Sequence, residues 1–161
     1  MNVAHSGSAS VTLPSDLEIV ITRVFDAPAR LVFEAMTTPE LVERWWGLRT
    51  SHFVVCEIDL QVGGAWRYVV RGPGDDEHGF HGVYREIEAP HRLVSTEVYE
   101  GFPDAESVNT VTLTEENGRT TLTTVVLHEK KEYRDGHINS GMEGGMQETF
   151  DRLEELLDSM K

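Results

Sequence analysis

The chain has 161 residues, of which 39% are apolar and 26% are charged, a balance typical of one soluble globular domain. Its 14 Lys and Arg residues stand against 28 Asp and Glu residues, so the formal net charge is -14. A field of this sign repels phosphate backbones and anionic lipids, so we expect neither nucleic acid nor a membrane as a partner. The lone Cys56 cannot form an intrachain disulfide, and we expect a cytoplasmic protein.

Residues 1–16 are rich in Ser, Ala and Gly and lack hydrophobic periodicity, so the sequence predicts a disordered N-terminal segment. We assign residues 17–161 to a single domain. The alternating, β-branched run EIVITRVF at residues 18–25 is typical of a strand. Apolar residues at helical spacing then predict two short helices, one ending near Thr38 and the next ending at Gly47.

Six further strands are predicted between Phe53 and Leu127. Each is a short run rich in apolar, β-branched or aromatic residues, and turns containing Gly, Pro or Asn separate the runs. Strands that follow one another in this way favour an antiparallel meander. The runs are FVVCEIDL, AWRYVVR, FHGVYREI, RLVSTEVY, SVNTVTLT and RTTLTTVVL.

The hydrophobic period becomes helical again between about His137 and Met160. This predicts one long amphipathic helix, the only element large enough to cover the concave face of a curved sheet. Three glycines, Gly141, Gly144 and Gly145, fall within the segment. Either they belong to a loop before the helix, or their missing side chains leave room for a ligand or for close backbone contact.

Four stretches of the sequence carry a family resemblance: ITRVFDAPARLVFEAMTTPELVERWWG, VGGAWRYVVRGP, GVYREIEAPHRLV and GMEGGMQETFDRLEELL. Together they resemble the START/SRPBCC superfamily, in the branch named after the activator of heat-shock-protein ATPase. The resemblance implies an α+β helix-grip fold, with a curved antiparallel sheet wrapped around a long C-terminal helix and two short helices after the first strand. It also implies a cavity between sheet and helix that accepts an apolar or amphipathic small molecule.

Catalytic and metal-binding motifs are not apparent in the sequence. His128 and Glu129 lack the second histidine that a zincin helix requires. His78 and His81 fall on opposite faces of a predicted strand. No nucleophile elbow, phosphate-binding loop or dinucleotide-binding glycine pattern occurs. We therefore predict no catalytic residue, no metal site and no cofactor.

The candidate ligand-binding residues are aromatic, methionine and glycine positions on the expected cavity wall. Trp66 and Tyr68 share one face of a strand, so both line the cavity if that face points inward. Consecutive tryptophans on a short helix diverge by roughly 100°, which suggests one core residue and one pocket or rim residue. Packing within the core is the alternative for every aromatic candidate. The candidates are Trp45, Trp46, Trp66, Tyr68, Tyr84, Tyr99, Met142, Gly145, Met146 and Phe150.

Two tyrosines share a strand face with a carboxylate. Tyr84 lies two residues from Glu86, and Tyr99 lies two residues from Glu97. Facing the cavity, such a carboxyl would have a raised pKa and could act as a general acid or base. Facing outward, the same pair would be solvated, which is the reading that the sequence favours.

The predicted function is binding of a small hydrophobic or aromatic molecule between sheet and C-terminal helix, rather than catalysis. One alternative is an enzyme of the polyketide cyclase or hydrolase type that uses the same cavity, for which a buried Glu or His facing the cavity would be the discriminating observation. The second is a co-chaperone-like protein-interaction module. The sequence leaves a homodimer open.

Overall fold

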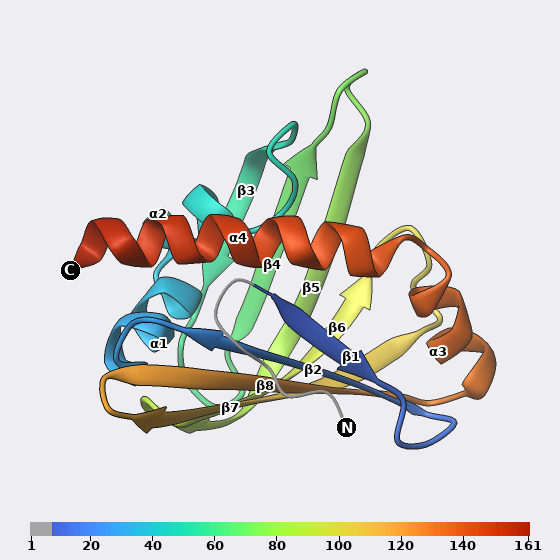
Figure 1. The fold of residues 1–161 in the computed structure, drawn as a ribbon. Coiled ribbons are helices and arrows are strands. Elements are labelled where there is room, and N and C mark those ends of the chain that lie inside the picture. The colour runs from blue at the N-terminus through green and yellow to red at the C-terminus, as the bar shows by residue number, and fades with distance from the viewer. Residues whose placement is uncertain (1–7) are drawn as a thin grey trace.

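The computed structural model describes residues 8–161, which form a curved antiparallel sheet and four helices (Figure 1). No helix in these residues has the length and hydropathy needed to cross a bilayer. The elements in chain order are β1 Ala9–Thr12, β2 Glu18–Phe25, α1 Ala29–Thr37, α2 Pro39–Trp45, β3 His52–Ile58, β4 Ala65–Arg71, β5 Glu77–Glu88, β6 Arg92–Tyr99, β7 Glu106–Glu116, β8 Arg119–His128, α3 Lys131–Ile138 and α4 Met142–Met160.

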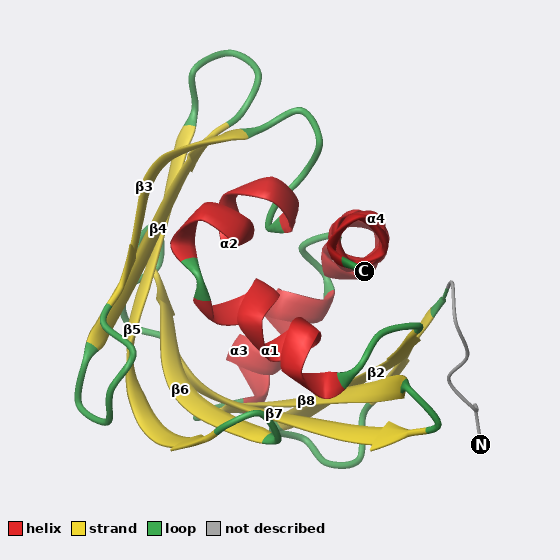
Figure 2. Ribbon diagram, turned by 90° about the vertical axis from the view of Figure 1, so that its left-hand side faces the viewer, coloured by secondary structure: helices red, strands yellow, loops and turns green. Residues whose placement is uncertain are grey.

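The sheet has eight strands in the order β1-β2-β8-β7-β6-β5-β4-β3. Strands β3 to β8 are neighbours in sequence and in space, which confirms the predicted meander. Strand β2 pairs with β8, and helices α1 and α2 connect β2 to β3 at the far edge. Figure 2 shows the sheet curving around the helices, with α4 across its open side. The predicted α+β helix-grip architecture is thus confirmed.

The N-terminal part of the chain differs from the prediction. Ala9–Thr12 forms strand β1 and pairs antiparallel with β2. The Gln147 side chain also accepts a hydrogen bond from the Ala9 amide (3.1 Å) and donates one to its carbonyl (2.9 Å). The prediction of disorder is therefore wrong for this segment, because long-range backbone pairing stabilises residues whose composition gives no strand signal. The prediction for residues 1–7 lies outside the described residues.

The C-terminal helical segment is divided rather than continuous. Gly141 has a φ of +83°, a left-handed conformation that separates α3 from α4. The predicted single helix from His137 is therefore wrong, since His137 belongs to α3 and the long helix begins at Met142. Gly144 and Gly145 lie within the first turns of α4, so only Gly141 belongs to the connecting turn.

The core has two parts along the concave face of the sheet. Around β2, inward residues such as Phe25 pack on α1 and on α4, where the ring centroid of Phe150 lies 5.7 Å from that of Phe25. Near β4, Trp66, Tyr68 and Tyr84 form a second buried cluster against α2. The alternation predicted from the sequence therefore points Trp66 and Tyr68 inward.

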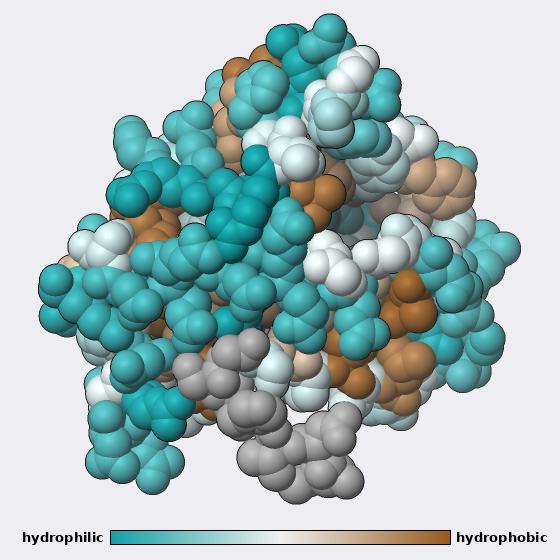
Figure 3. Space-filling view, turned by 45° about the horizontal axis from the view of Figure 1, so that its top comes forward, coloured by the Kyte–Doolittle hydropathy of each residue, from teal (hydrophilic) through white to brown (hydrophobic). Residues whose placement is uncertain are grey.

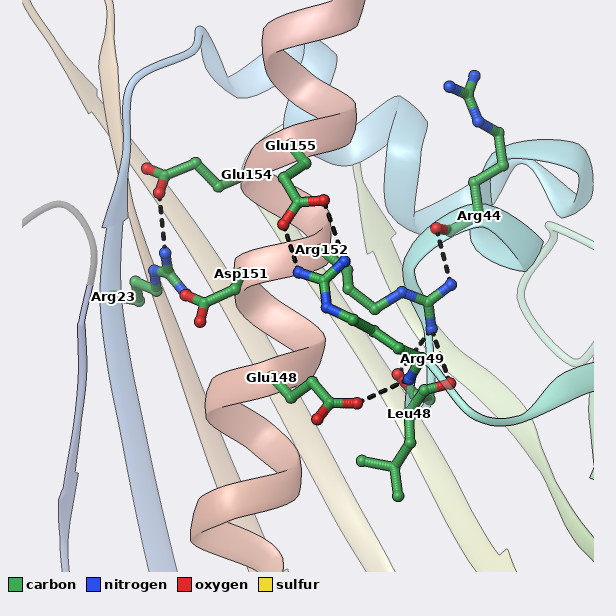
Figure 4. Close-up of polar contacts among 10 residues, drawn as sticks. Arg23, Arg44, Leu48, Arg49, Glu148, Asp151, Arg152, Glu154 and Glu155 are labelled. Carbon is green, nitrogen blue, oxygen red and sulfur yellow. Dashed lines mark hydrogen bonds and ion pairs between the residues drawn. The ribbon is translucent and has the colours of Figure 1, made fainter. Parts of the chain in front are cut away.

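Arginine side chains fasten the C-terminal half of α4 from both sides (Figure 4). Arg23 is completely buried on β2 and forms ion pairs with Asp151 at 2.9 Å and Glu154 at 3.0 Å. On the other side, Arg152 donates to the Gly47 carbonyl at 2.8 Å, beside the end of α2. These contacts hold α4 over the sheet at one end, while α3 and the start of α4 lie over the other end.

Candidate functional site

A large cavity lies between the concave side of β5 to β8, helix α3 and the start of α4. Its volume is about 710 Å³ and it is partly open to solvent. Figure 3 shows a mostly hydrophilic face with several separate hydrophobic patches, one of them on the side that carries α3 in Figure 1. The lining residues are Phe80, Tyr99, Phe102, Tyr133, Met142, Ala105 and Gly136, with the polar residues His78, Glu97, Ser107, His128, Glu132, His137 and Ser140.

Two smaller hollows are lined partly by charged side chains. One, of about 340 Å³, lies beside the end of α2, where Arg49 forms a bidentate ion pair with Glu155. The other, of about 260 Å³, contains Arg67, which donates to Glu100 twice at 2.9 Å. Because Arg49 and Arg67 are already paired with Glu155 and Glu100, the large, aromatic-walled cavity is the better candidate for a ligand site.

Aromatic rings from three parts of the chain form the cavity walls. Strand pairing places Phe80 on β5 opposite Tyr99 on β6, with ring centroids 5.2 Å apart. At the rim, Phe102 from the β6–β7 loop makes an edge-to-face contact with Tyr133 of α3 at 5.5 Å. The Tyr99 hydroxyl also lies 2.8 Å from Nδ1 of His78. The walls therefore offer flat apolar faces with a few polar groups at fixed places.

A row of polar residues crosses the concave face at the cavity. Glu97 on β6 is directly opposite Ser107 on β7, which is directly opposite His128 on β8. Ser107 and His128 are buried, and Glu97 is partly buried. Strand register brings the three residues together: the β6–β7 loop separates Glu97 from Ser107, and most of β7 and β8 separates Ser107 from His128.

The Glu97 carboxyl is held by a short hydrogen-bond chain. Asn109 Nδ2 donates to Glu97 Oε1 at 2.6 Å, and the Ser107 hydroxyl donates to Asn109 Oδ1 at 3.3 Å. Burial raises the pKa of the Glu97 carboxyl, and the Asn109 hydrogen bond only partly offsets this effect. The Ser107 hydroxyl and one N–H of the Asn109 amide donate within this network, so the Glu97 carboxyl is the main acceptor on this part of the wall.

Two histidines meet at the end of the polar row that lies away from Glu97. Nε2 of His128 lies 3.1 Å from Nδ1 of His137 on α3. Burial lowers the pKa of His128 to about 4, with His137 and Arg134 contributing, and burial also lowers the pKa of His137. Both imidazoles are therefore neutral at pH 7. No Lys or Arg is among the described residues that line the cavity.

Two of the predicted site residues, Tyr99 and Met142, line this cavity. Trp66, Tyr68 and Tyr84 face the same side of the sheet but pack in the neighbouring cluster. The indole of Trp66 donates to the Thr96 carbonyl at 3.1 Å, as a buried core side chain does. Glu86, the predicted neighbour of Tyr84, is exposed because the strand register shifts between these two residues.

The consecutive tryptophans diverge as the helical geometry predicts. Trp45 is buried in the main core, where its indole donates to the Ala35 carbonyl at 2.8 Å. Trp46 contacts Tyr68 and Phe80, each at a centroid distance of 5.1 Å. Since Phe80 lines the cavity, Trp46 lies one ring away from it.

The remaining predicted residues lie further along α4, outside the cavity lining. Phe150 and Met146 pack against the main core. A Cβ placed on Gly145 would lie 3.7 Å from a methyl group of Leu48. This stretch of α4 therefore packs on the main core, near the ion pairs of Arg23 with Asp151 and Glu154.

The sequence patterns did not indicate Phe80, Phe102, Ser107, His128, Tyr133 and His137 as cavity residues. Helix α3, which supplies two of them, was not predicted because its charged, glycine-containing sequence has little hydrophobic periodicity. One signal was available in the sequence. Ser107 occupies an inward position of an alternating strand, where an apolar residue is expected, and a polar residue at such a position can indicate a functional site.

The described residues show no group of three or more His, Cys, Asp or Glu side chains arranged to hold a metal ion. Taken together, the observations define an α+β protein with a partly open cavity of about 710 Å³ between its concave sheet and helices. A family model with the description "Activator of Hsp90 ATPase homolog 1-like protein" matches residues 26–158, and the chain belongs to this family. The family resemblance read from the sequence is thereby confirmed.

Solved structures support the same fold. A protein from Rhodobacter sphaeroides is 28% identical, with a TM-score of 0.88 over 94% of this chain and 99% of that chain. A protein from Arthrobacter aurescens is also 28% identical, with a TM-score of 0.82 over 93% of this chain and 91% of that chain. A Nitrosomonas europaea protein, 24% identical with a TM-score of 0.83 over 92% and 98%, shows the fold alone. A comparison with curated proteins finds no match.

Proposed function

We propose that the protein binds a small hydrophobic or aromatic molecule in the cavity between β5 to β8 and α3. The observation that carries this proposal is the aromatic-walled space of about 710 Å³. Ligand sites of small molecules are typically concave, largely apolar and roughly 300–1,000 Å³ in volume, with a few fixed polar groups. Hydrophobic ligands are also common in this fold family.

The construction of the cavity supports a ligand rather than tighter packing. Phe80, Tyr99 and Tyr133 are held by ring contacts and strand pairing, so the walls exist before a ligand arrives. Tyr99 and Phe102 remain well exposed, at 38% and 50%. Covering these rings with an apolar ligand would release ordered water and contribute about 25 cal/mol for each Å² of apolar surface buried.

A matched pair of glycine variants tests the proposal. Gly136 on α3 lines the cavity, and a Cβ placed there meets no atom within 4 Å. Gly144 on α4 has the same free space but lies outside the cavity lining. Both changes to leucine raise helix propensity, so a difference between them reports on the cavity itself.

The measurement is a fluorescence titration with a panel of apolar aromatic compounds, for the wild-type protein and both variants. We expect stoichiometric binding to the wild-type protein and to Gly144→Leu, and affinities weaker by about tenfold or more for Gly136→Leu, on the order of 1.4 kcal/mol. Equal affinities for the two variants, or no binding below millimolar concentration to the wild-type protein, would contradict the proposal.

A second candidate function is catalysis in the same cavity. It is favoured by Glu97, His128 and His137, because a carboxyl with a raised pKa and neutral imidazoles are groups that transfer protons. A chemical change in a bound compound, detected by mass spectrometry and abolished in Glu97→Gln, would support it. The co-chaperone alternative stays untested, since it is raised by the family description alone.

A further inference from the structure

The charged side chains that line the cavity carry one sign. Its described lining contains the carboxyl groups of Glu97 and Glu132 and no Lys or Arg side chain. We propose, building on the proposed ligand-binding function, that the ligand is an amphiphilic amine: an apolar, aromatic body carrying one protonated amino group, which Glu97 binds. This assigns both a chemical class to the ligand and a specificity-determining role to Glu97.

The Glu97 carboxyl has an oxygen available for a ligand. Asn109 Nδ2 donates to Oε1 at 2.6 Å, and the described residues provide no hydrogen-bond partner for Oε2. The hydrogen bond from the Ser107 hydroxyl to Asn109 Oδ1 fixes the orientation of the Asn109 amide, so its NH2 group faces Glu97 as a donor. A protonated amine supplies the donor and the positive charge that this site lacks, and charge-assisted hydrogen bonds are about twice as strong as neutral ones.

Nearby cations are already used elsewhere. Glu132 stands at the mouth, where its Oε1 lies 3.9 Å from Nζ of Lys130. Arg134 is buried but donates to Asp135 at 2.9 Å and to the Ser15 carbonyl at 2.6 Å. Glu97 is therefore the carboxyl at the cavity whose charge the protein does not match.

The aromatic walls also favour a cation. A positive group near the face of an aromatic ring is attracted by the ring quadrupole, and the attraction is stronger where solvent is excluded. The rim already contains one such contact, with Nζ of Lys130 at 5.3 Å from the ring centroid of Tyr133. The net charge of -14 further raises the local concentration of cationic molecules around the protein.

The two deeper histidines do not oppose a bound amine. Burial lowers the pKa of both His128 and His137, so neither ring is positively charged at pH 7. A carboxylate ligand, such as a fatty acid, would instead meet Glu97 without a basic side chain to compensate. A neutral alcohol can donate a hydrogen bond to Glu97 but gains no charge pairing.

The test compares three probes that share one apolar body: phenylbutylamine, phenylbutanol and phenylbutyrate. Isothermal titration calorimetry at pH 7 measures the affinity of each probe for the full chain. We expect the amine to bind the wild-type protein at least about tenfold more tightly than the alcohol, as one charge-assisted hydrogen bond provides. The carboxylate should bind most weakly.

Glu97→Gln removes the charge while keeping the side-chain shape and an oxygen that can accept the Asn109 hydrogen bond. In this variant the amine should bind no better than the alcohol, and the affinity for the alcohol should stay close to that of the wild-type protein. Glu116→Gln is the matched control, because it makes the same change in net charge at an exposed position outside the cavity lining. It should keep the wild-type order of affinities.

The outcomes separate this inference from the proposed function. If the alcohol or the carboxylate binds the wild-type protein as tightly as the amine, or if the preference for the amine survives in Glu97→Gln, the inference is overturned while ligand binding stands. If only other members of the aromatic panel bind, the inference also fails. If no probe and no panel compound binds, the proposed function fails with it. Should Glu97→Gln not fold, the order of the three wild-type affinities decides.

Discussion

Nε2 of His128, at the end of β8, lies 3.1 Å from Nδ1 of His137 on α3, and the two rings meet edge to face with centroids 5.3 Å apart. One imidazole donates to the other, so this contact joins the sheet to the helix that covers the cavity. His128 is 8% exposed, and its Nδ1 is buried without a partner among the described residues. A proton added to this pair would place a charge on a largely buried group, which is unfavourable.

The histidine pair predicts a loss of stability in mild acid. An unfolded histidine has a pKa of about 6.5, whereas burial lowers the pKa of His128 to about 4 in the folded chain. The unfolded state therefore binds protons first: stability is fully present above about pH 6.5 and is lost as the pH falls toward 4. The nearby charged groups are Arg134, which adds to the effect, and Glu97 and Glu132 across the cavity.

Urea denaturation across this pH range measures the effect for the wild-type protein and for His128→Leu. We expect the wild-type protein to lose on the order of 2 kcal/mol of unfolding free energy through this pair, and His128→Leu to lose less over the same range. Parallel pH profiles for the two proteins would show that the pair does not control acid stability.

The buried ion pairs of Arg23 predict an asymmetric pair of variants. Removing both partners by Asp151→Asn and Glu154→Gln leaves a guanidinium that is 0% exposed without its carboxylates. We expect a loss of about 2–3 kcal/mol, since both partners are partly exposed and water screens their share. Arg23→Met removes the buried charge itself and should cost less. Denaturant titrations that find Arg23→Met the more damaging change would contradict this reasoning.

The glycines around the start of α4 predict opposite effects. Gly144→Ala should stabilise the protein by about 1 kcal/mol, because the position is helical and its Cβ would meet no atom within 4 Å. Gly141→Ala should destabilise it by about 1 kcal/mol or more, because an L-residue rarely adopts its φ of +83°. Thermal melts of both variants give the answer, and a reversed order would mean that the turn between α3 and α4 is not as described.

Trp46 should report ligand binding by fluorescence. Its ring lies 5.1 Å from that of Phe80, which lines the cavity, whereas Trp45 is buried in the main core. We expect Trp46→Phe to remove most of the emission change caused by an aromatic ligand and Trp45→Phe to preserve it. A signal that persists in Trp46→Phe and disappears in Trp45→Phe would place the ligand elsewhere.

Local patterns predicted the elements better than they predicted the site. Alternation placed Trp66 and Tyr68 on the inward face correctly, because side-chain direction in a strand follows sequence parity. The same rule could not tell that these rings pack together while the cavity opens beside them. The sequence favoured an outward, solvated Glu97, and this prediction is wrong, because Glu97 lines the cavity. Its alignment with Ser107 and His128 depends on register across three strands, which no local pattern contains.

The most direct test of ligand binding in this cavity is a backbone amide NMR titration of the wild-type protein with its tightest aromatic ligand. We expect the large shift changes to fall on the cavity ends of β5 to β8, the β6–β7 loop and α3, including Glu97, Ser107 and His128. Changes centred instead on the arginine-lined hollow beside Arg49 and Arg152, or spread over the convex face of the sheet, would contradict it.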